Sequence, residues 1–414
     1  MKKVLLATTA LIAFGAVSAN AADPVKLAIG GYMVEDVGFA TNDSGLNKTN
    51  VDVQSDVNVN FVGSSKLDNG ITVGVEVDTF GSQRQDSRNV AAGHTNTTTT
   101  TTGNSDVKRS FATVSGGFGA AIIGEREDAL YIIHNSAPDV GDVGLQDGRW
   151  FQWVQTPSQH RVYTATNTSR YDDRTQKISY VTPSFYGLAA GASYVPNASL
   201  GQSGHTSIAS NQATANSLNS GSVNGSDFGG DVYGAGLAFT NTFGGVSIKA
   251  DLGAAQANLA GLDLYQGGLQ VGYAGFTFGG SILNRHVGDK ATAVVSVEGA
   301  GNNILANNAQ TKTAAYAGQS WDAGVAYATG PYAVSLGYFA DRSKDDGLAA
   351  LGAGDGGGAD STGVWTLSGA YTMGPGVAWH NSVSRVVYTD GAGGQSSANA
   401  NKGYAVVTGL RVDF

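Results

Sequence analysis

Residues 51–61, VDVQSDVNVNF, decide the fold of this chain. The odd positions are apolar except at Ser55, and the even positions hold only Asp, Gln and Asn. Successive side chains of a β-strand point to opposite faces of the sheet. A period of two therefore predicts a strand with one apolar face and one hydrated face.

The same period returns along the whole chain, in residues 71–78, 246–252, 332–338 and 404–414. Charged residues make up only 14% of the chain, whereas soluble domains average about 25%. The 60 glycines and 7 prolines suit many strands joined by tight turns. Strands with a single apolar face produce such a neutral average composition, so the sequence predicts an all-β protein.

The segments between the predicted strands fall into two length classes. Seven are short turns, nearly all with Gly or Pro: 64–70, 115–119, 183–187, 241–245, 273–276, 329–332 and 373–376. Eight are longer and polar: 40–48, 84–105, 127–173, 196–230, 254–261, 286–317, 342–361 and 389–401. Short turns at one end and long loops at the other are the layout of a transmembrane antiparallel β-barrel. We therefore predict one barrel of 16 strands.

A sheet inside a bilayer must close, because every backbone group there needs a partner. Val25, Leu27 and Ile29 alternate with Lys26, Ala28 and Gly30, so the first strand can pair with residues 404–414. A barrel of 16 strands leaves an aqueous channel, and the polar inward residues would be costly in a dry core. We expect a water-filled lumen. Aromatic residues near the short turns suit a girdle at the membrane boundary: Tyr180, Phe185, Tyr186, Tyr273, Phe276, Tyr332, Tyr371 and Phe414.

The N-terminus has the features of a secretory signal peptide. Lys2 and Lys3 precede a short apolar run, and Ala19-Asn20-Ala21 offers the small residues that signal peptidase reads. The run is too short for a membrane-spanning helix, which needs about 20 residues. We expect cleavage after residue 21 and a mature barrel of residues 22–414. An uncleaved anchor helix is the alternative.

Several segments resemble the general diffusion porins of Gram-negative bacteria, particularly their α-proteobacterial branch. The resemblance extends from end to end, and no single motif carries it alone. The motifs are Gly63-Ser64-Ser65-Lys66-Leu67-Asp68-Asn69-Gly70, Arg109-Ser110-Phe111, Gly116-Gly117-Phe118-Gly119, Lys177-Ile178-Ser179-Tyr180-Val181-Thr182-Pro183 and the terminal Phe414.

The resemblance implies a homotrimer in the outer membrane whose third loop, Glu127–Asp173, folds inward and narrows each pore. Acidic residues on that loop would face basic residues on the barrel wall. The acidic candidates are Glu125, Asp128, Asp139, Asp142 and Asp147, and the basic candidates, chosen by strand parity, are Lys26, Lys177, Lys249, Arg285 and Arg411. Glu125 stands where relatives often have Arg, so the local field is expected to be shifted.

The resemblance also implies partners. Phe414, with Val412 and Leu410 at spacings of two, is similar to the signal that the barrel-assembly machinery reads. Periplasmic chaperones, outer-membrane lipid and lipopolysaccharide are further expected partners. Nucleic acid is not, because the chain carries a net charge of −9 and phosphate binding needs a basic surface. That acidic balance favours a mild preference for cations.

Other functions stay open at this point. An outer-membrane enzyme would need a nucleophile and base, or paired carboxylates, but the six histidines are scattered and Gly352–Gly357 fits G-x-G-x-x-G only within a loop. A channel selective for a sugar, phosphate or peptide could use Trp150, Phe151 and Trp153 as an aromatic track, although packing against the wall explains them better. We expect no catalytic residue, metal site or cofactor. We keep one exception, which is loosely bound Ca²⁺ at Asp341, Asp345 and Asp346. The alternative for these residues is a solvated run of charges without a bound ion.

Overall fold

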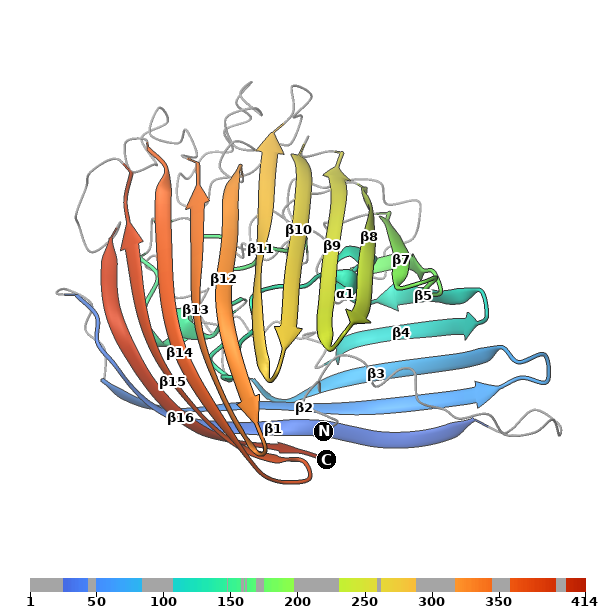
Figure 1. Ribbon diagram of the computed structural model, residues 1–414, viewed down its shortest axis with the longest axis horizontal. Helices are drawn as coiled ribbons and strands as arrows, with labels where there is room; N and C mark the ends of the chain where they lie inside the picture. The colour runs from blue at the N-terminus through green and yellow to red at the C-terminus, as the bar shows by residue number, and fades with distance from the viewer. Residues whose placement is uncertain are drawn as a thin grey trace, which may run out of the picture.

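The chain closes into a barrel of antiparallel strands, as the alternating stretches predict. The computed structural model describes residues 25–43, 50–83, 107–146, 148–157, 160, 162–168, 175–196, 231–258, 262–287, 317–344, 358–391 and 400–414. Within them, 16 strands form one closed sheet in which each strand pairs with its neighbours in sequence (Figure 1). The predicted signal peptide, residues 1–21, lies outside the described residues, as do Asp147, Asp345, Asp346 and Gly352–Gly357.

The strand bounds fix which connections are short. The strands are β1 (Lys26–Ala40), β2 (Val51–Lys66), β3 (Thr72–Gln83), β4 (Val107–Gly116), β5 (Gly119–Glu125), β6 (Gln176–Val181), β7 (Leu188–Val195), β8 (Val232–Phe243), β9 (Val246–Ala257), β10 (Leu262–Tyr273), β11 (Phe276–Val287), β12 (Gly318–Thr329), β13 (Tyr332–Ser343), β14 (Asp360–Gly374), β15 (Val377–Thr389) and β16 (Asn401–Asp413). The seven predicted short turns all join consecutive strands at one end of the barrel. At the other end, the connection after β9 is shorter than predicted, because β9 continues to Ala257.

Closure depends on the pairing of β1 with β16. The register runs from Tyr32 opposite Asp413 to Ala40 opposite Ala405. Gly31 and Phe414 add two backbone hydrogen bonds of 2.9 and 3.0 Å. The predicted seam is thus confirmed. The first residues of β1 extend past it and pair with β2 alone, where Ile29 lies opposite Phe61.

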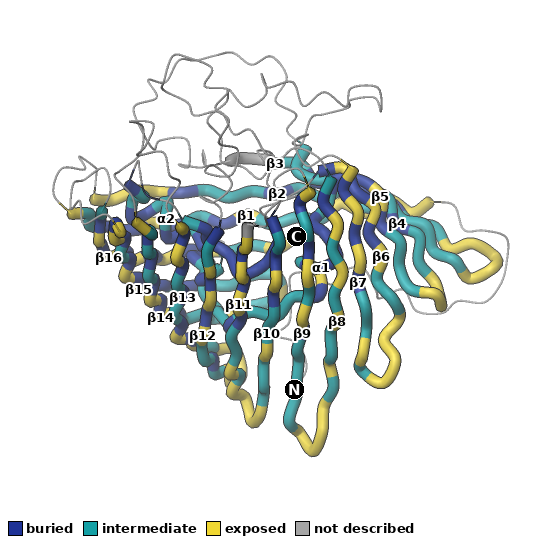
Figure 2. The backbone as a smooth tube through the Cα atoms, turned by 90° about the horizontal axis from the view of Figure 1, so that it is seen from above, coloured by how far each residue is buried: buried dark blue, intermediate teal, exposed yellow. Residues whose placement is uncertain are grey.

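Burial alternates along the strands as the period of two requires (Figure 2). Val53 is 64% exposed on the outer face, whereas Gln54, its neighbour on the inner face, is 1% exposed. Apart from the half-buried Tyr371, the girdle aromatics lie exposed. Tyr332 and Tyr371 stack with their ring centroids 5.0 Å apart. The outer face is therefore largely apolar, and the inner face combines polar residues with apolar ones that lie in two buried clusters.

Two short helices lie in the connection between β5 and β6. They are α1 (Ala129–Ile133) and α2 (Trp150–Trp153). In Figure 1 this connection runs inside the barrel, with α1 beside β7 to β9. Among the described residues, no helix is long and apolar enough to cross a membrane.

Candidate pore constriction

The connection between β5 and β6, residues 126–175, is called the inner loop below. Its backbone N–H groups donate hydrogen bonds to side chains that project inward from the wall. Ala129 N–H binds Ser193 Oγ at 2.7 Å, Asn135 N–H binds Asp251 at 2.6 Å, and Ala137 N–H binds Asp322 at 3.0 Å. Further along, Val140 N–H binds Ser335 Oγ at 3.1 Å, and Gln155 N–H binds Asn42 at 2.9 Å. The loop is thus attached to the wall at points from β7 round to the end of β1.

The start of the inner loop is fixed by a capped helix. Asp128 is the N-cap of α1, and its carboxylate accepts hydrogen bonds from Tyr131 N–H at 2.7 Å and Thr168 Oγ1 at 2.9 Å. Leu130 and Ile133 pack into an apolar cluster with wall residues of β7 to β11. The wall admits Leu130 because Gly253 carries no side chain there; a Cβ atom at Gly253 would collide with the leucine.

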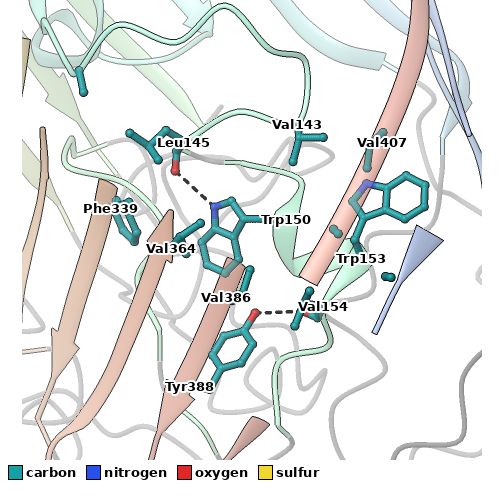
Figure 3. Close-up of a cluster of buried hydrophobic side chains, with 13 residues drawn as sticks. Val143, Leu145, Trp150, Trp153, Val154, Phe339, Val364, Val386, Tyr388 and Val407 are labelled. Carbon is teal, nitrogen blue, oxygen red and sulfur yellow. Dashed lines mark hydrogen bonds between the residues drawn. The ribbon is translucent and has the colours of Figure 1, made fainter. Parts of the chain in front are cut away.

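A second apolar cluster holds the middle of the loop (Figure 3). Trp150 is fully buried among Phe339, Val364 and Tyr388 of the wall, and its Nε1 donates to Leu145 O at 3.3 Å. Tyr388 Oη donates in turn to Val154 O at 3.1 Å. Trp150 and Trp153, which is 5% exposed, therefore pack the loop against the wall, and neither offers a face to solutes as an aromatic track.

A first charged group lies where the loop leaves the wall. Arg109 of β4 pairs with Glu127 of the loop, its Nε 3.0 Å from Oε1, and with Asp78 of β3 at 3.2 Å. The guanidinium of Arg126 lies 4.7 Å from the centre of the Phe111 ring. The Arg109 side chain is 27% exposed, so this group lines a space that water reaches.

A second charged group lies at the seam. Arg149 and Asp142 of the loop pair with each other, and Arg149 also binds Asp36 of β1. Arg411 of β16 stands 3.9 Å from Asp142 and covers the Tyr32 ring at 4.4 Å. Arg411 is 26% exposed, and Arg149 and Asp142 are each 15% exposed. Acidic and basic groups therefore alternate here, rather than facing each other from loop and wall.

The predicted acidic residues divide by position. Asp142 lies in the second charged group. Asp139 is half-buried and accepts a hydrogen bond from Ser335 Oγ at 3.0 Å, while Asp128 is a buried cap of α1. Glu125 is 6% exposed and accepts hydrogen bonds from Ser110 at 3.3 Å and Gln176 at 3.1 Å; strand parity groups it with the outward Ile123. Asp147 is outside the described residues.

All five predicted basic residues lie on the inner parity, and only Arg411 faces Asp142. Lys177 is buried and donates to Arg126 O. Arg285 is 2% exposed and bound to Asp341 at 2.8 Å beneath the loop. Lys26 and Lys249 lie in the half of the barrel nearer the short turns. Strand parity thus predicts that a side chain points into the barrel, but it does not predict whether the inner loop covers that side chain.

Sequence reasoning missed Asp36, Asp78, Arg109, Arg126 and Arg149 as members of the charged groups. Parity would have placed Asp36 and Asp78 inside. The resemblance implies acidic residues on the loop and basic ones on the wall, whereas Asp36 and Asp78 are acidic residues of the wall. Nothing in the sequence shows that Arg149 reaches β1, since the loop has no period.

Burial changes the proton affinity of two loop residues. It raises the pKa of Asp128, because a charged carboxylate loses its hydration and the hydrogen bonds from Tyr131 and Thr168 only partly replace it. Burial likewise lowers the pKa of Arg126. Both effects follow from packing the loop against the wall.

Among the described residues, one group could hold a metal ion. Ligand atoms of Asp36, Asp142 and His380 lie within 4.8 Å of one another. A divalent cation there would compete with Arg149, which already binds both carboxylates. The expected Ca²⁺ ligand Asp341 is not a loop residue; it is buried and bonded to Arg285, Ser320 and Ser343.

An acid, a histidine and a hydroxyl line up beneath the loop. His134 Nδ1 lies 2.9 Å from Asp251, and its Nε2 lies 3.1 Å from Thr166 Oγ1. Such an order resembles a catalytic triad. Thr166 is fully buried, however, and its hydroxyl also bonds Ser281 at 2.6 Å. A substrate has no access to it, so the arrangement supports the loop.

The chain is similar to known channel proteins. Residues 7–391 match the sequence model of the Gram-negative porin family, and no curated protein sequence is significantly similar. The anion-selective porin from Comamonas acidovorans shares the fold with a TM-score of 0.53 at 16% identity, over 94% of this chain and 100% of that chain.

Two other solved structures share the fold. The trimer form of OmpT, an outer membrane protein of Vibrio cholerae, gives a TM-score of 0.53 at 11% identity over 95% of this chain and 100% of that chain. A mutant of Rh. blastica porin gives 0.51 at 16% identity over 94% of this chain and 100% of that chain.

Proposed function

Because the chain belongs to the Gram-negative porin family, we propose that its water path runs between the inner loop and the wall formed by β16 and β1 to β4. The protein is an outer-membrane porin, a channel for passive diffusion of small hydrophilic solutes. The observation that carries the path is the difference in exposure among inward arginines. The side chains of Arg109 and Arg411 are 27% and 26% exposed, whereas the side chain of Arg285 beneath the loop is 1% exposed.

The charges along this path favour cations slightly. Carboxylates of Asp36, Asp78, Glu127 and Asp142 are interleaved with the guanidinium groups of Arg109, Arg149 and Arg411. Opposite charges so close together cancel much of each other's field beyond about 8–10 Å at physiological salt. The negative net charge of the chain then makes the channel weakly selective for cations.

Reconstitution into a planar bilayer tests both statements. The expected result is an ohmic conductance that does not saturate with neutral sugars, and a small reversal potential of cationic sign across a KCl gradient. A strong anion preference would overturn the charge argument but leave the channel function standing. Absence of any conductance would overturn the channel function itself.

We infer that the protein assembles as a homotrimer through the outer face of β1 to β6. Polar groups gather on that face: Glu35 accepts a hydrogen bond from Ser55 at 2.7 Å, and Glu125 binds Ser110 and Gln176. Charged groups facing lipid are destabilising, so a second copy of the chain is a better neighbour for this face. The similar OmpT structure is itself a trimer form.

The chain contains no cysteine, so a single introduced thiol reports on its own surroundings. A spin label at Ser55→Cys should be shielded from oxygen dissolved in the bilayer, whereas one at Val383→Cys, on the exposed outer face of β15, should be accessible. Equal accessibility of the two labels would argue against this interface.

We further propose that residues 1–21 are removed on export, and that Phe414 is recognised by the barrel-assembly machinery after delivery by periplasmic chaperones. The protein needs no cofactor for diffusion and has no enzymatic activity. Ca²⁺ binds at most weakly, in competition with Arg149 at Asp36 and Asp142. Sequencing the N-terminus of the mature protein tests the first statement, and conductance with and without a chelator tests the last.

A further inference from the structure

Two buried polar side chains face each other across the seam of the barrel. Asp36 of β1 and His380 of β15 both stand opposite Gly409 of β16, so the three residues form one row across neighbouring strands (Figure 1). Gly409 has no side chain, and a Cβ atom there would collide with the carboxylate of Asp36. The carboxylate and the imidazole therefore approach each other over the glycine.

The facing atoms of this pair are buried without a hydrogen bond. The side chain of Asp36 is 0% exposed and that of His380 is 7% exposed. Asp36 Oδ1 and His380 Nε2 lie 3.9 Å apart, and within the described part of the chain neither atom makes a hydrogen bond. Buried polar atoms nearly always have a partner, since losing their hydration is costly. The two atoms therefore favour a group that binds both at once.

Asp142 of the inner loop supplies a third ligand. Ligand atoms of Asp36, Asp142 and His380 lie within 4.8 Å of one another. The loop comes this close to the wall because Gly141 packs on the hydroxyl of Ser382, two residues from His380 on β15, where a Cβ atom would collide with it. The side chain of Asp142 is 15% exposed, so an ion can enter from the water path.

The donor atoms and their spacing suit a transition-metal dication better than Ca²⁺. Imidazole nitrogen is a ligand of Zn²⁺, Ni²⁺ and Cu²⁺, whereas Ca²⁺ takes about six to eight oxygen ligands. Zn²⁺ binds imidazole and carboxylate at about 2.0–2.2 Å, so two ligands of a tetrahedral ion lie about 3.4 Å apart. The distance from Asp36 Oδ1 to His380 Nε2 exceeds that value by about 0.5 Å, which a small side-chain rotation removes.

Arg149 is the competitor of such an ion. Its guanidinium contacts Oδ2 of Asp36 and Oδ2 of Asp142. Asp36 Oδ1 is therefore left for the pair with His380, whereas Asp142 is shared between Arg149 and the ion. Affinity for a dication then depends on how readily Arg149 leaves Asp142.

We propose that Asp36, Asp142 and His380 bind one Zn²⁺ or a similar transition-metal dication, which takes the place of Arg149 at Asp142. The bound ion brings two positive charges to the water path, so it shifts the selectivity of the channel toward anions. The inference goes beyond passive diffusion, and only the effect on selectivity rests on the proposed path.

Zinc binding to the full-length protein, purified in detergent and freed of metal with a chelator, tests the site. Isothermal titration with ZnCl₂ should find one ion per chain, and His380→Gln should bind it at least tenfold more weakly. His160→Gln is the matched control: His160 is also buried with a carboxylate, that of Asp360, at 3.9 Å, but the described residues place no third ligand beside that pair. It should bind zinc like the wild type.

Arg149→Gln gives a test that mere damage to the loop would not pass. Removal of the competitor should tighten zinc binding at least tenfold, and CaCl₂ should bind the wild type at least tenfold more weakly than ZnCl₂. Unchanged affinity in His380→Gln, an equal loss in His160→Gln, weaker binding in Arg149→Gln, or equal affinity for Ca²⁺ would each overturn the proposal. Heat-modifiable mobility on gels shows that the variants fold.

Reversal potentials across a KCl gradient measure the effect on the channel. Micromolar ZnCl₂ should lower the permeability ratio of K⁺ to Cl⁻ in the wild type, a chelator should restore it, and His380→Gln should not respond. An unchanged ratio in the zinc-loaded wild type would overturn the placement of the ion beside the water path. Calorimetry needs no conductance, so failure of the zinc site is distinct from failure of the channel function.

Discussion

At the scale of single residues, Arg149 decides how the charges at the seam are balanced. It binds Asp36 and Asp142 at once, so its neutral replacement leaves Asp36 without this guanidinium partner and Asp142 with Arg411 at 3.9 Å beside the water path. A single charge 5 to 10 Å from a permeating ion contributes about 0.4 to 0.8 kcal/mol in water. Arg149 therefore has more influence on selectivity than any inward arginine covered by the loop.

We predict that Arg149→Gln raises the permeability ratio of K⁺ to Cl⁻ by about twofold to fourfold, following that electrostatic contribution. The measurement is the reversal potential across a KCl gradient. Arg342→Gln removes the same charge from the outer face and should leave the ratio unchanged. A shift toward anions in Arg149→Gln would contradict the assignment of this residue to the pore.

The raised pKa of Asp128 predicts the direction in which the stability of the protein changes with pH. Burial raises its pKa above the usual value of 3.8, so the folded protein binds the proton more tightly than the unfolded chain. The free energy of unfolding contributed by this group therefore falls as the pH rises through that window. Wild type should gain thermal stability relative to Asp128→Asn when the pH is lowered from about 7 towards 4.

Thermal unfolding in detergent at several pH values measures this difference. A gap between wild type and Asp128→Asn that is independent of pH, or that grows with rising pH, would refute the assignment. Asp263→Asn is a control, because this half-buried carboxyl lies on β10 and accepts a hydrogen bond from Gln256 of β9 at 3.0 Å, not from the inner loop.

At the scale of elements, two apolar clusters and a series of polar contacts hold the inner loop against the wall. Trp150 is the largest fully buried side chain of the protein among the described residues. Its loss affects α2 and the second cluster while the sheet keeps its own hydrogen bonds. The loop should therefore loosen without unfolding of the barrel.

We expect Trp150→Ala to weaken the attachment of the loop by about 3–5 kcal/mol, the usual cost of removing a buried tryptophan. Single-channel recordings should show a noisier conductance with frequent transitions. Trp379→Ala, on the exposed outer face, should record like the wild type. Quiet channels in Trp150→Ala would show that the cluster does not hold the loop.

The elements also show what sequence could predict. The strands were predictable because a side-chain period of two follows directly from a sheet with one face in lipid and one in water. The inner loop has no such period, and its partners lie on strands more than 100 residues away, as with Ala137 and Asp322. Glu125 shares the strand parity of Ile123, which can be read from the sequence, whereas the resemblance implies that it belongs with the acidic residues of the constriction.

At the scale of the whole molecule, the barrel depends on the β1–β16 seam. Phe414 closes that seam through two backbone hydrogen bonds with Gly31, and its side chain is 61% exposed. Deletion of Phe414 should reduce the amount of folded protein in the outer membrane severalfold, since both recognition and closure are affected.

Quantitative blots of heat-modifiable porin in outer-membrane fractions measure that loss. Phe414→Tyr keeps the ring and the backbone contacts and should assemble normally. Normal assembly of the deletion variant would show that neither role of Phe414 is required.

The apolar clusters that pack the inner loop against the barrel take their wall residues from β7 to β11, from β13 to β16 and from the end of β1; among the described residues, none lies on β2 or β3. The two flanks of one sheet should therefore differ in rigidity. Hydrogen–deuterium exchange should be slow on the strands that these clusters back and faster along β2 and β3, whose inner side chains include the polar Gln54, Asn58 and Asp78. Under osmotic or lateral stress, deformation of the barrel should begin at β2 and β3. Neighbouring subunits in an assembly would support these strands from outside.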